Sequence, residues 1–246
     1  MQQVFVEPEA VENDFITVTG DDVKHMKNVL RMKVGERIRV SCSDGRNFFC
    51  CIKELNADNI VTEIIEDAPS TELTNKIYLF QALPKGDRME TVIEKAVELG
   101  VYEIIPVAMK YCVVKLDEKK KVSKVKRYQA IAESAAKQSK RSYVPQIHPV
   151  MSFKEAAKYA ADCDVRLVPY ENKDGMKATV EAMAKIKPGQ SVSIMIGPEG
   201  GIAEEEIEMV RDSMDVISLG SRILRTDTAA ITTMSMVMLA SEEKEL

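Results

Sequence analysis

The 246-residue sequence has few of the side chains from which metal centres and disulfide frameworks are built. Its five cysteines are odd in number and form no Cys-x-x-Cys pair, and only His25 and His148 offer imidazole ligands. Structural zinc sites and disulfide-rich folds both require closely spaced ligands or paired cysteines. We therefore expect no metal site, and we expect the cysteines to be reduced, as in the cytoplasm.

Long apolar runs are also missing from the sequence. The longest, such as Val192–Ile196 and Met234–Ala240, are far shorter than the roughly 20 residues that cross a bilayer. The N-terminus lacks a basic region followed by an apolar core, the pattern of a signal peptide. No Gly-x-Gly-x-x-Gly fingerprint is present, which disfavours a nicotinamide dehydrogenase. We expect a cytoplasmic protein without a membrane partner.

The sequence has no excess of positive charge overall, since the formal net charge is −5, but its basic residues are concentrated in two places. The segment from Lys110 to Arg141 holds eleven Lys or Arg and three acids. A second cluster, Lys24, Lys27, Arg31, Lys33, Arg37 and Arg39, contains one acid, Glu36. Clusters of this kind are typical of RNA-binding surfaces, and equally of solvated lysine-rich faces. Charge alone leaves both interpretations open.

The first 72 residues favour a small antiparallel sheet or barrel. Short alternating stretches at 15–18, 37–42, 47–52 and 60–65 are separated by turn residues, among them Asp44-Gly45. One helix is expected over 21–31, with Val23, Met26, Val29 and Leu30 on its apolar face. That helix would direct Lys24, Lys27 and Arg31 outward.

From residue 76 onward, expected strands alternate with expected helices. The strands are at 77–82, 101–107, 165–169, 191–196 and 215–219, and the helices at 87–99, 122–138, 152–161, 176–185, 203–212 and 227–240. This alternation predicts an α/β domain with a mainly parallel sheet covered on both faces. We expect two domains, 1–72 and 73–246.

Two late strands run directly into glycine-containing turns, at 196–201 (Ile-Gly-Pro-Glu-Gly-Gly) and at 219–229 (Leu-Gly-Ser-Arg-Ile-Leu-Arg-Thr-Asp-Thr-Ala). Open α/β sheets bind ligands at the carboxyl ends of their strands, and glycine lets a ligand approach the main chain closely. The pair predicts a site for a flat ligand. Two tight strand-to-helix connections without a ligand are the alternative.

The two turns resemble the SPOUT class of S-adenosylmethionine (SAM)-dependent RNA methyltransferases, and together they are similar to the RsmE family. Stretches 25–36, 85–101 and 135–147 resemble the same family in the same order. The resemblance implies a C-terminal trefoil knot, an N-terminal PUA-like RNA-binding barrel and a homodimer. It also implies methylation of N3 of a uridine in 16S ribosomal RNA. We expect the assembled small subunit as the substrate, and free RNA stays open as the alternative. Another nucleoside or ribose 2′-O target, or a non-catalytic RNA-binding protein, stays open as an alternative.

The resemblance also assigns site residues. The expected SAM site comprises Pro169, Tyr170, Ile196, Gly197, Glu199, Gly200, Gly201, Leu219, Gly220, Ile223, Leu224, Arg225, Thr228 and Ala229. The expected RNA contacts are Lys24, Lys27, Arg31, Lys137, Arg141 and Arg222.

Uracil N3 must lose a proton before it can attack, so a base or an anion-stabilising cation is needed. We expect Arg225 nearest the chemistry, and we expect Glu199 either to order its turn or to meet the substrate. The sequence departs from the family pattern at Lys110-Tyr111, where the family usually carries Glu-Arg, and at Asp227, where Glu is more usual.

Overall fold

The computed structural model describes residues 1–170 and 175–242. The chain forms two compact units. The N-terminal unit comprises Met1–Glu72 together with Ala136–Val144, and the C-terminal unit comprises Leu73–Ala135 together with Pro145–Leu246. Within the described residues, no helix is both long enough and apolar enough to span a membrane.

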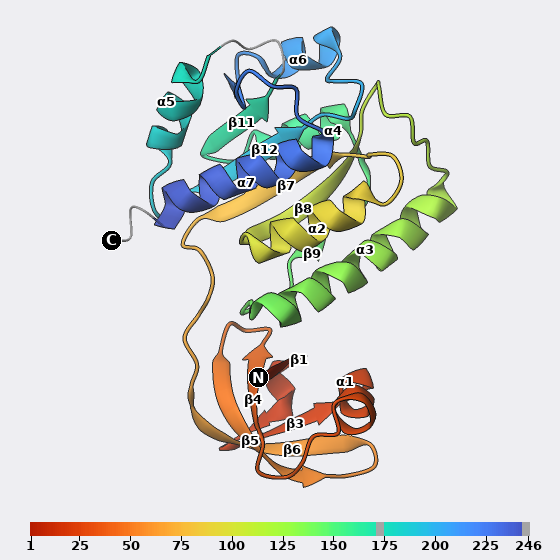
Figure 1. The fold of residues 1–246 in the computed structure, drawn as a ribbon, viewed down its shortest axis with the longest axis vertical. Coiled ribbons are helices and arrows are strands. Elements are labelled where there is room, and N and C mark those ends of the chain that lie inside the picture. Colours follow the sequence, from red (N-terminus) through yellow and green to blue (C-terminus); the bar gives the residue numbers. More distant parts are fainter. Residues whose placement is uncertain (171–174, 243–246) are drawn as a thin grey trace. The chain divides into compact units, whose positions relative to one another are not determined.

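The N-terminal unit is built on a six-stranded sheet (Figure 1). Its strands are β1 (Gln2–Val6), β2 (Val11–Glu12), β3 (Phe15–Thr19), β4 (Arg37–Cys42), β5 (Asn47–Leu55) and β6 (Asn59–Asp67), in the order β1-β4-β5-β6-β3-β2. All neighbours are antiparallel except β1 and β4. In β3 only Ile16 and Val18 are buried, as alternation requires. The predicted small β domain is confirmed, although neither β1 nor β2 was expected.

The single helix expected over 21–31 is wrong in its second half. A short helix, α1 (Asp21–Lys24), passes into a π-helical turn over His25–Val29, where the backbone N–H of Leu30 bonds the carbonyl five residues back. The wider turn changes which side chains face inward. Val29 and Leu30, expected in the core, are 66% and 43% exposed.

The C-terminal unit contains a seven-stranded sheet in which every strand pair is parallel. Its strands are β7 (Lys76–Ala82), β8 (Val101–Ala108), β9 (Gln146–Ile147), β10 (Met151–Ser152), β11 (Val165–Pro169), β12 (Ser191–Ile196) and β13 (Asp215–Ile217). The order is β10-β8-β7-β12-β11-β13, and β9 pairs with β8. The predicted parallel α/β domain is therefore confirmed.

Helices cover both faces of this sheet (Figure 1). The helices of this unit are α2 (Arg88–Glu98), α3 (Glu118–Ser139), α4 (Phe153–Ala160), α5 (Lys177–Lys185), α6 (Glu204–Val210) and α7 (Thr226–Glu242). The last residues of α3, from Ala136 on, belong to the N-terminal unit. On one face α2 contacts α7, and they pack on β8 and β12 respectively. On the other, Phe153 of α4 and Ile207 of α6 join Phe80 and Ile105 in one apolar core. Because both faces are covered, the strands are apolar almost throughout.

The strand order brings the two glycine-containing turns to one edge of the sheet. β11 lies between β12 and β13, so the turns that follow β12 and β13 leave the sheet on either side of Pro169. The carboxyl end of β7 adjoins that of β12, where Gln81 is in register with Ile196. The backbone alone thus assembles a concave edge, the usual ligand position in parallel sheets.

Candidate cofactor site

A cavity of about 600 Å³ opens between the two turns. It is lined by residues expected at the SAM site, namely Pro169, Tyr170, Ile196, Gly197, Glu199, Gly200, Gly201, Leu219, Gly220, Ile223, Leu224, Arg225 and Ala229. Thr228, also expected there, is not among the lining residues. Six lining residues were not expected at the SAM site, namely Arg88, Pro198, Ile202, Ser218, Ser221 and Thr226, and the lining residue Arg222 was expected at RNA.

The first turn requires glycine at two positions for different reasons. Gly201 has a φ of +76°, a backbone conformation that L side chains rarely adopt. A Cβ at Gly197 would lie 2.7 Å from Cγ1 of Ile202, so the turn closes only without one. The N–H of Gly201 then bonds the carbonyl of Pro198 at 2.9 Å. The result is a tight turn that leaves main chain bare toward the cavity.

A threonine hydroxyl ties the second turn to the first. Thr226 Oγ1 donates to the Gly197 carbonyl at 2.7 Å and accepts from Gln81 Nε2 at 3.0 Å. Gln81 is fully buried in β7 and Thr226 is 5% exposed. The start of α7 is thereby fixed to the turn after β12. A lone glutamine that follows the residues Ile-Tyr-Leu-Phe at 77–80 was the sequence signal that could have pointed to this contact.

Glu199 orders its turn through contacts with the segment that leads into α2. Its Oε1 accepts from the backbone N–H of Lys85 at 2.9 Å and also pairs with the Arg88 guanidinium. Burial is the largest single influence and disfavours the charged form. The N–H groups of Lys85 and of Glu199 itself, with Arg88, outweigh it and hold the pKa of Glu199 below its ordinary value. A carboxylate with a lowered pKa is a weak proton acceptor at neutral pH.

The pKa of Glu199 predicts acid sensitivity of this contact. A carboxyl whose pKa is lower in the folded state contributes stability that is present above the unfolded-state pKa and is lost as the pH falls through the folded-state value. We expect the free energy of unfolding of wild type to fall faster than that of Glu199→Gln as the pH drops below about 4.5, the ordinary glutamate value. Urea titrations at stepwise lower pH measure this difference. Parallel curves for the two proteins would contradict it.

Arg222 and Arg225 lie on the cavity wall with exposed side chains. Neither side chain makes a hydrogen bond or an ion pair within residues 1–170 and 175–242. An arginine at position 225 could instead bridge carbonyls of its loop or the Asp227 carboxylate. Such a bond is not seen in this part of the chain. As far as the described residues go, both guanidinium groups are available to an anionic ligand.

The basic residues expected at RNA differ in their surroundings. Lys24 and Arg31 are exposed, and Lys24 Nζ lies 3.8 Å from the Asp21 carboxylate. Lys27 donates to the Asn56 carbonyl at 2.6 Å. Lys137 is half-buried and donates to Asp22 at 2.8 Å, within the N-terminal unit. Among Lys24, Lys27, Arg31 and Lys137, the side chains of Lys24 and Arg31 are therefore the most open to a phosphate.

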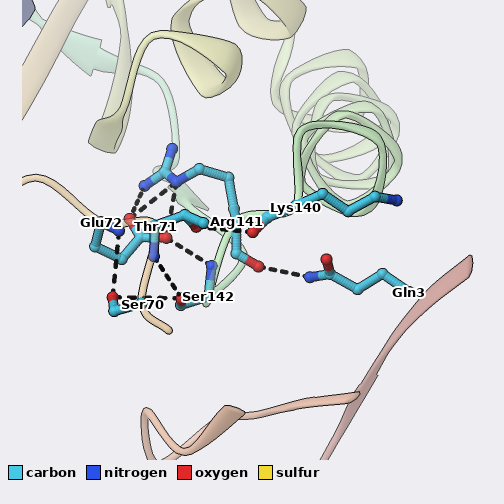
Figure 2. A network of polar contacts seen from close by, with 7 residues as sticks. All are labelled: Gln3, Ser70, Thr71, Glu72, Lys140, Arg141 and Ser142. Carbon is cyan, nitrogen blue, oxygen red and sulfur yellow. Dashed lines mark hydrogen bonds and ion pairs between the residues drawn. The ribbon is translucent and has the colours of Figure 1, made fainter. Parts of the chain in front are cut away.

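Arg141, which the resemblance assigned to RNA, lies inside the N-terminal unit instead (Figure 2). Its side chain is 3% exposed, and Nε and Nη2 donate to the Glu72 carboxylate at 2.5–2.9 Å. The Ser142 N–H donates to the same carboxylate at 2.6 Å, and Gln3 Nε2 donates to the Arg141 carbonyl at 2.6 Å. Thr71 Oγ1 bonds the Lys140 carbonyl. The guanidinium has an internal partner, so this geometry lends no support to a phosphate contact.

The described residues offer little for two further classes of site, metal centres and cysteine nucleophiles. No group of three or more His, Cys, Asp or Glu side chains that could hold a metal ion occurs in 1–170 and 175–242. All five cysteines are free. Burial raises the pKa of Cys112, which reduces its thiolate fraction and hence its reactivity as a nucleophile.

Comparison with known proteins places the chain in a family. The sequence profile of an RNA methyltransferase domain matches residues 71–238, and that of an RNA methyltransferase PUA domain matches residues 18–65. A protein named ribosomal RNA small subunit methyltransferase E from Bacillus subtilis (strain 168) is 36% identical, covering 98% of both chains. One from Mesomycoplasma hyopneumoniae is 35% identical, covering 94% of this chain and 96% of its own.

Solved structures agree with the sequence comparisons. A crystal structure of ribosomal RNA small subunit methyltransferase E from Neisseria gonorrhoeae, bound to S-adenosyl methionine, has a TM-score of 0.82 to this chain. The two are 29% identical, and the match covers 97% of each chain. The architecture, the cavity between the glycine-containing turns and these relatives lead to one conclusion: the chain belongs to the ribosomal RNA small subunit methyltransferase E family.

Proposed function

We propose that this protein uses SAM to methylate N3 of a specific uridine in 16S ribosomal RNA. The observation that carries the proposal is the cavity between the turns after β12 and β13, in a fold that a SAM-bound relative shares over 97% of its length. The relatives' names point to RNA of the small ribosomal subunit. We place the activity in the cytoplasm, with the assembled subunit as substrate.

The cavity suits an adenosine-containing ligand. Its volume of about 600 Å³ lies within the roughly 300–1,000 Å³ typical of small-molecule pockets. Its walls combine bare main chain at Gly197 and Gly220 with apolar side chains such as Leu219 and Leu224. Backbone N–H and carbonyl groups can bond an adenine edge and ribose hydroxyls, and the apolar side chains can cover the ring faces. The same residues would hold SAM, which when bound supplies an electrophilic methyl group.

The chain's own contribution to the reaction is positioning and charge. Methyl transfer from a sulfonium is an in-line displacement, so a rigid cavity that fixes the approach of the acceptor supplies most of what is required. The Thr226 hydroxyl bond and the Glu199 contacts make the two turns rigid. Arginines at the cavity meet negative charge on the acceptor base or its phosphates.

RNA binding by the N-terminal unit is proposed to involve Lys24 and Arg31. We expect Lys24→Ala and Arg31→Ala each to weaken RNA binding and to lower the slope of log affinity against log salt by about one, since each removes one phosphate contact. Fluorescence anisotropy at several salt concentrations measures both quantities. Lys177→Ala, at an exposed lysine of α5, is the matched control and should leave the slope unchanged. Equal slopes in all four proteins would contradict the prediction.

Two structural features implied by the resemblance also belong to the proposal. α7 has no Lys or Arg among its 17 residues, and Leu239 is 63% exposed, which suits an interface with a second copy of the chain. We propose a homodimer that buries α7, and a trefoil knot through which α7 is threaded. Sedimentation equilibrium of wild type and Leu239→Glu tests the dimer. An unaltered mass in the variant would argue against α7 as the interface.

The proposed activity has a direct test. Purified protein is incubated with labelled SAM and with small subunits whose RNA lacks the modification, and the product is mapped by mass spectrometry after nuclease digestion. N3-methyluridine at one position is the expected result. A 2′-O-methyl product or a methylated purine would replace the acceptor assignment. No transfer, with no thermal stabilisation by SAM, would favour a non-catalytic RNA-binding role.

A further inference from the structure

Arg88 is the one arginine on the cavity wall that is held in place within the described residues. Its guanidinium pairs with Glu199, whereas Arg222 and Arg225 lack partners there. Glu199 is itself fixed by the Lys85 N–H. The charge of Arg88 is therefore anchored through a second side chain to the backbone of the turn that precedes α2.

The backbone of Arg88 is fixed as well. It is the first residue of α2, whose next turns bury Met89, Val92 and Ile93 in the core. The Arg88 side chain is 34% exposed, and Glu199 is 24% exposed, so the pair sits at the border between cavity and solvent. One ion pair with Glu199 leaves other N–H groups of the five-donor guanidinium for a ligand.

The chemistry of the acceptor explains why a cation is placed there. A sulfonium is positively charged and gains nothing from a neighbouring guanidinium. A uracil that has lost its N3 proton carries negative charge shared with O2 and O4, and a guanidinium matches that distribution. A donor fixed before the reaction stabilises developing charge better than one that must first be ordered.

We propose that Arg88 is a catalytic residue that contacts the acceptor uracil and stabilises its N3 anion, with Glu199 as the positioning residue that aims it. The proposal rests on the function proposed above. In the step itself, N3 first gives its proton to solvent. The N3 lone pair then forms the N–C bond as the C–S bond breaks, and the sulfur leaves as a neutral thioether with the electron pair. Arg88 exchanges no proton in this step.

The assignment makes Arg88, not Arg225, the cation nearest the reacting ring. Arg225 and Arg222 are exposed and unordered by any partner in the described residues, which suits contacts to flanking phosphates. Their loss should therefore raise KM for RNA, whereas loss of Arg88 should lower kcat.

The test measures single-turnover methylation by Arg88→Ala, Arg88→Lys and Glu199→Gln from pH 6 to pH 10. We expect Arg88→Ala to reduce the rate about 10²–10³-fold at neutral pH, the range seen when one preorganised donor to an anionic centre is removed. The deficit should shrink as the pH rises, because hydroxide then removes the N3 proton without help. Arg88→Lys should recover part of the rate. Glu199→Gln, whose amide oxygen can still accept from Arg88, should lose less than Arg88→Ala.

The control variant is Arg211→Ala, which removes an arginine that also pairs with a glutamate, Glu208, in the same unit but away from the cavity. It should match wild type. Calorimetric SAM affinity and the melting temperature are measured for every variant. An Arg88→Ala rate that stays in constant ratio to wild type at all pH values, or a defect explained by weaker SAM binding, would overturn the proposal. Wild-type protein that makes no N3-methyluridine would overturn the proposed function instead.

Discussion

Replacement of Glu72 by alanine is expected to destabilise the N-terminal unit by about 3–5 kcal/mol, the cost of leaving a buried charge without its partner. The Arg141 side chain is 3% exposed, and two nitrogens of its guanidinium donate hydrogen bonds to the Glu72 carboxylate. The carboxylate also accepts from the Ser142 N–H. Loss of this carboxylate therefore leaves both the Arg141 guanidinium and the Ser142 N–H without this partner. Hydrogen exchange of the amides in β1 and β4, followed in the full chain, reports the unfolding of this unit.

Two further variants test whether the effect of Glu72→Ala comes from the buried ion pair with Arg141. Glu66→Ala removes an exposed partner of Arg37 in the same unit, and it should cost less than about 1 kcal/mol. Adding Arg141→Met to Glu72→Ala should restore part of the stability, because no unpaired charge then remains buried. If Glu72→Ala proved as mild as Glu66→Ala, the ion pair would not be holding residues 140–142 in place.

Thr226→Val is expected to weaken SAM binding about 5- to 150-fold, corresponding to about 1–3 kcal/mol for buried polar groups left without partners. Valine fills the same space but neither donates to the Gly197 carbonyl nor accepts from Gln81. Both cavity turns would lose the bond that joins them. Isothermal titration with SAM and with S-adenosylhomocysteine measures the loss.

The matched control for this variant lies in the same helix. Thr233 is fully buried and its hydroxyl bonds the Ala229 carbonyl one turn back, so this bond stays within α7 and does not join the two cavity turns. Thr233→Val should leave SAM affinity within twofold of wild type, and Thr226→Ser should retain most of the binding. Equal losses from Thr226→Val and Thr233→Val would mean that any change in α7 disturbs the site.

Most of the secondary structure of the C-terminal unit could be predicted because it follows from short-range sequence patterns. Most of its buried strands and amphipathic helices can be recognised within about ten residues, and α2 lies where the helix at 87–99 was expected. The two-residue strands β9 and β10 were not predicted. Parallel pairing and the meeting of the two turns at one edge then follow from alternation of strands and helices. The identity of the ligand did not follow from this pattern and came from the resemblance.

The parts that sequence reasoning missed depend on partners far along the chain. Gln81 and Thr226 bond across 145 positions, and Glu199 meets Arg88 across 111. Arg141 was assigned to RNA by the family resemblance. Its position in a basic segment could not correct that assignment, because the local sequence is the same whether a charged residue faces water or a distant carboxylate. The π-helical turn was missed for a different reason: the i to i+5 spacing of His25 and Leu30 leaves the composition of a helix unaltered while rotating Val29 and Leu30 outward.

The discontinuous make-up of the N-terminal unit has a consequence for biosynthesis. Translation delivers Met1–Glu72 first, but Ala136–Val144 emerges only after Leu73–Ala135 has been made. Until then Gln3 and Glu72 in the nascent chain lack their hydrogen-bond partners Arg141 and Ser142. Domains that fold as contiguous units can finish while their successors are still being synthesised. The N-terminal unit, in contrast, cannot complete its folding on the ribosome until residues 136–144 have been synthesised.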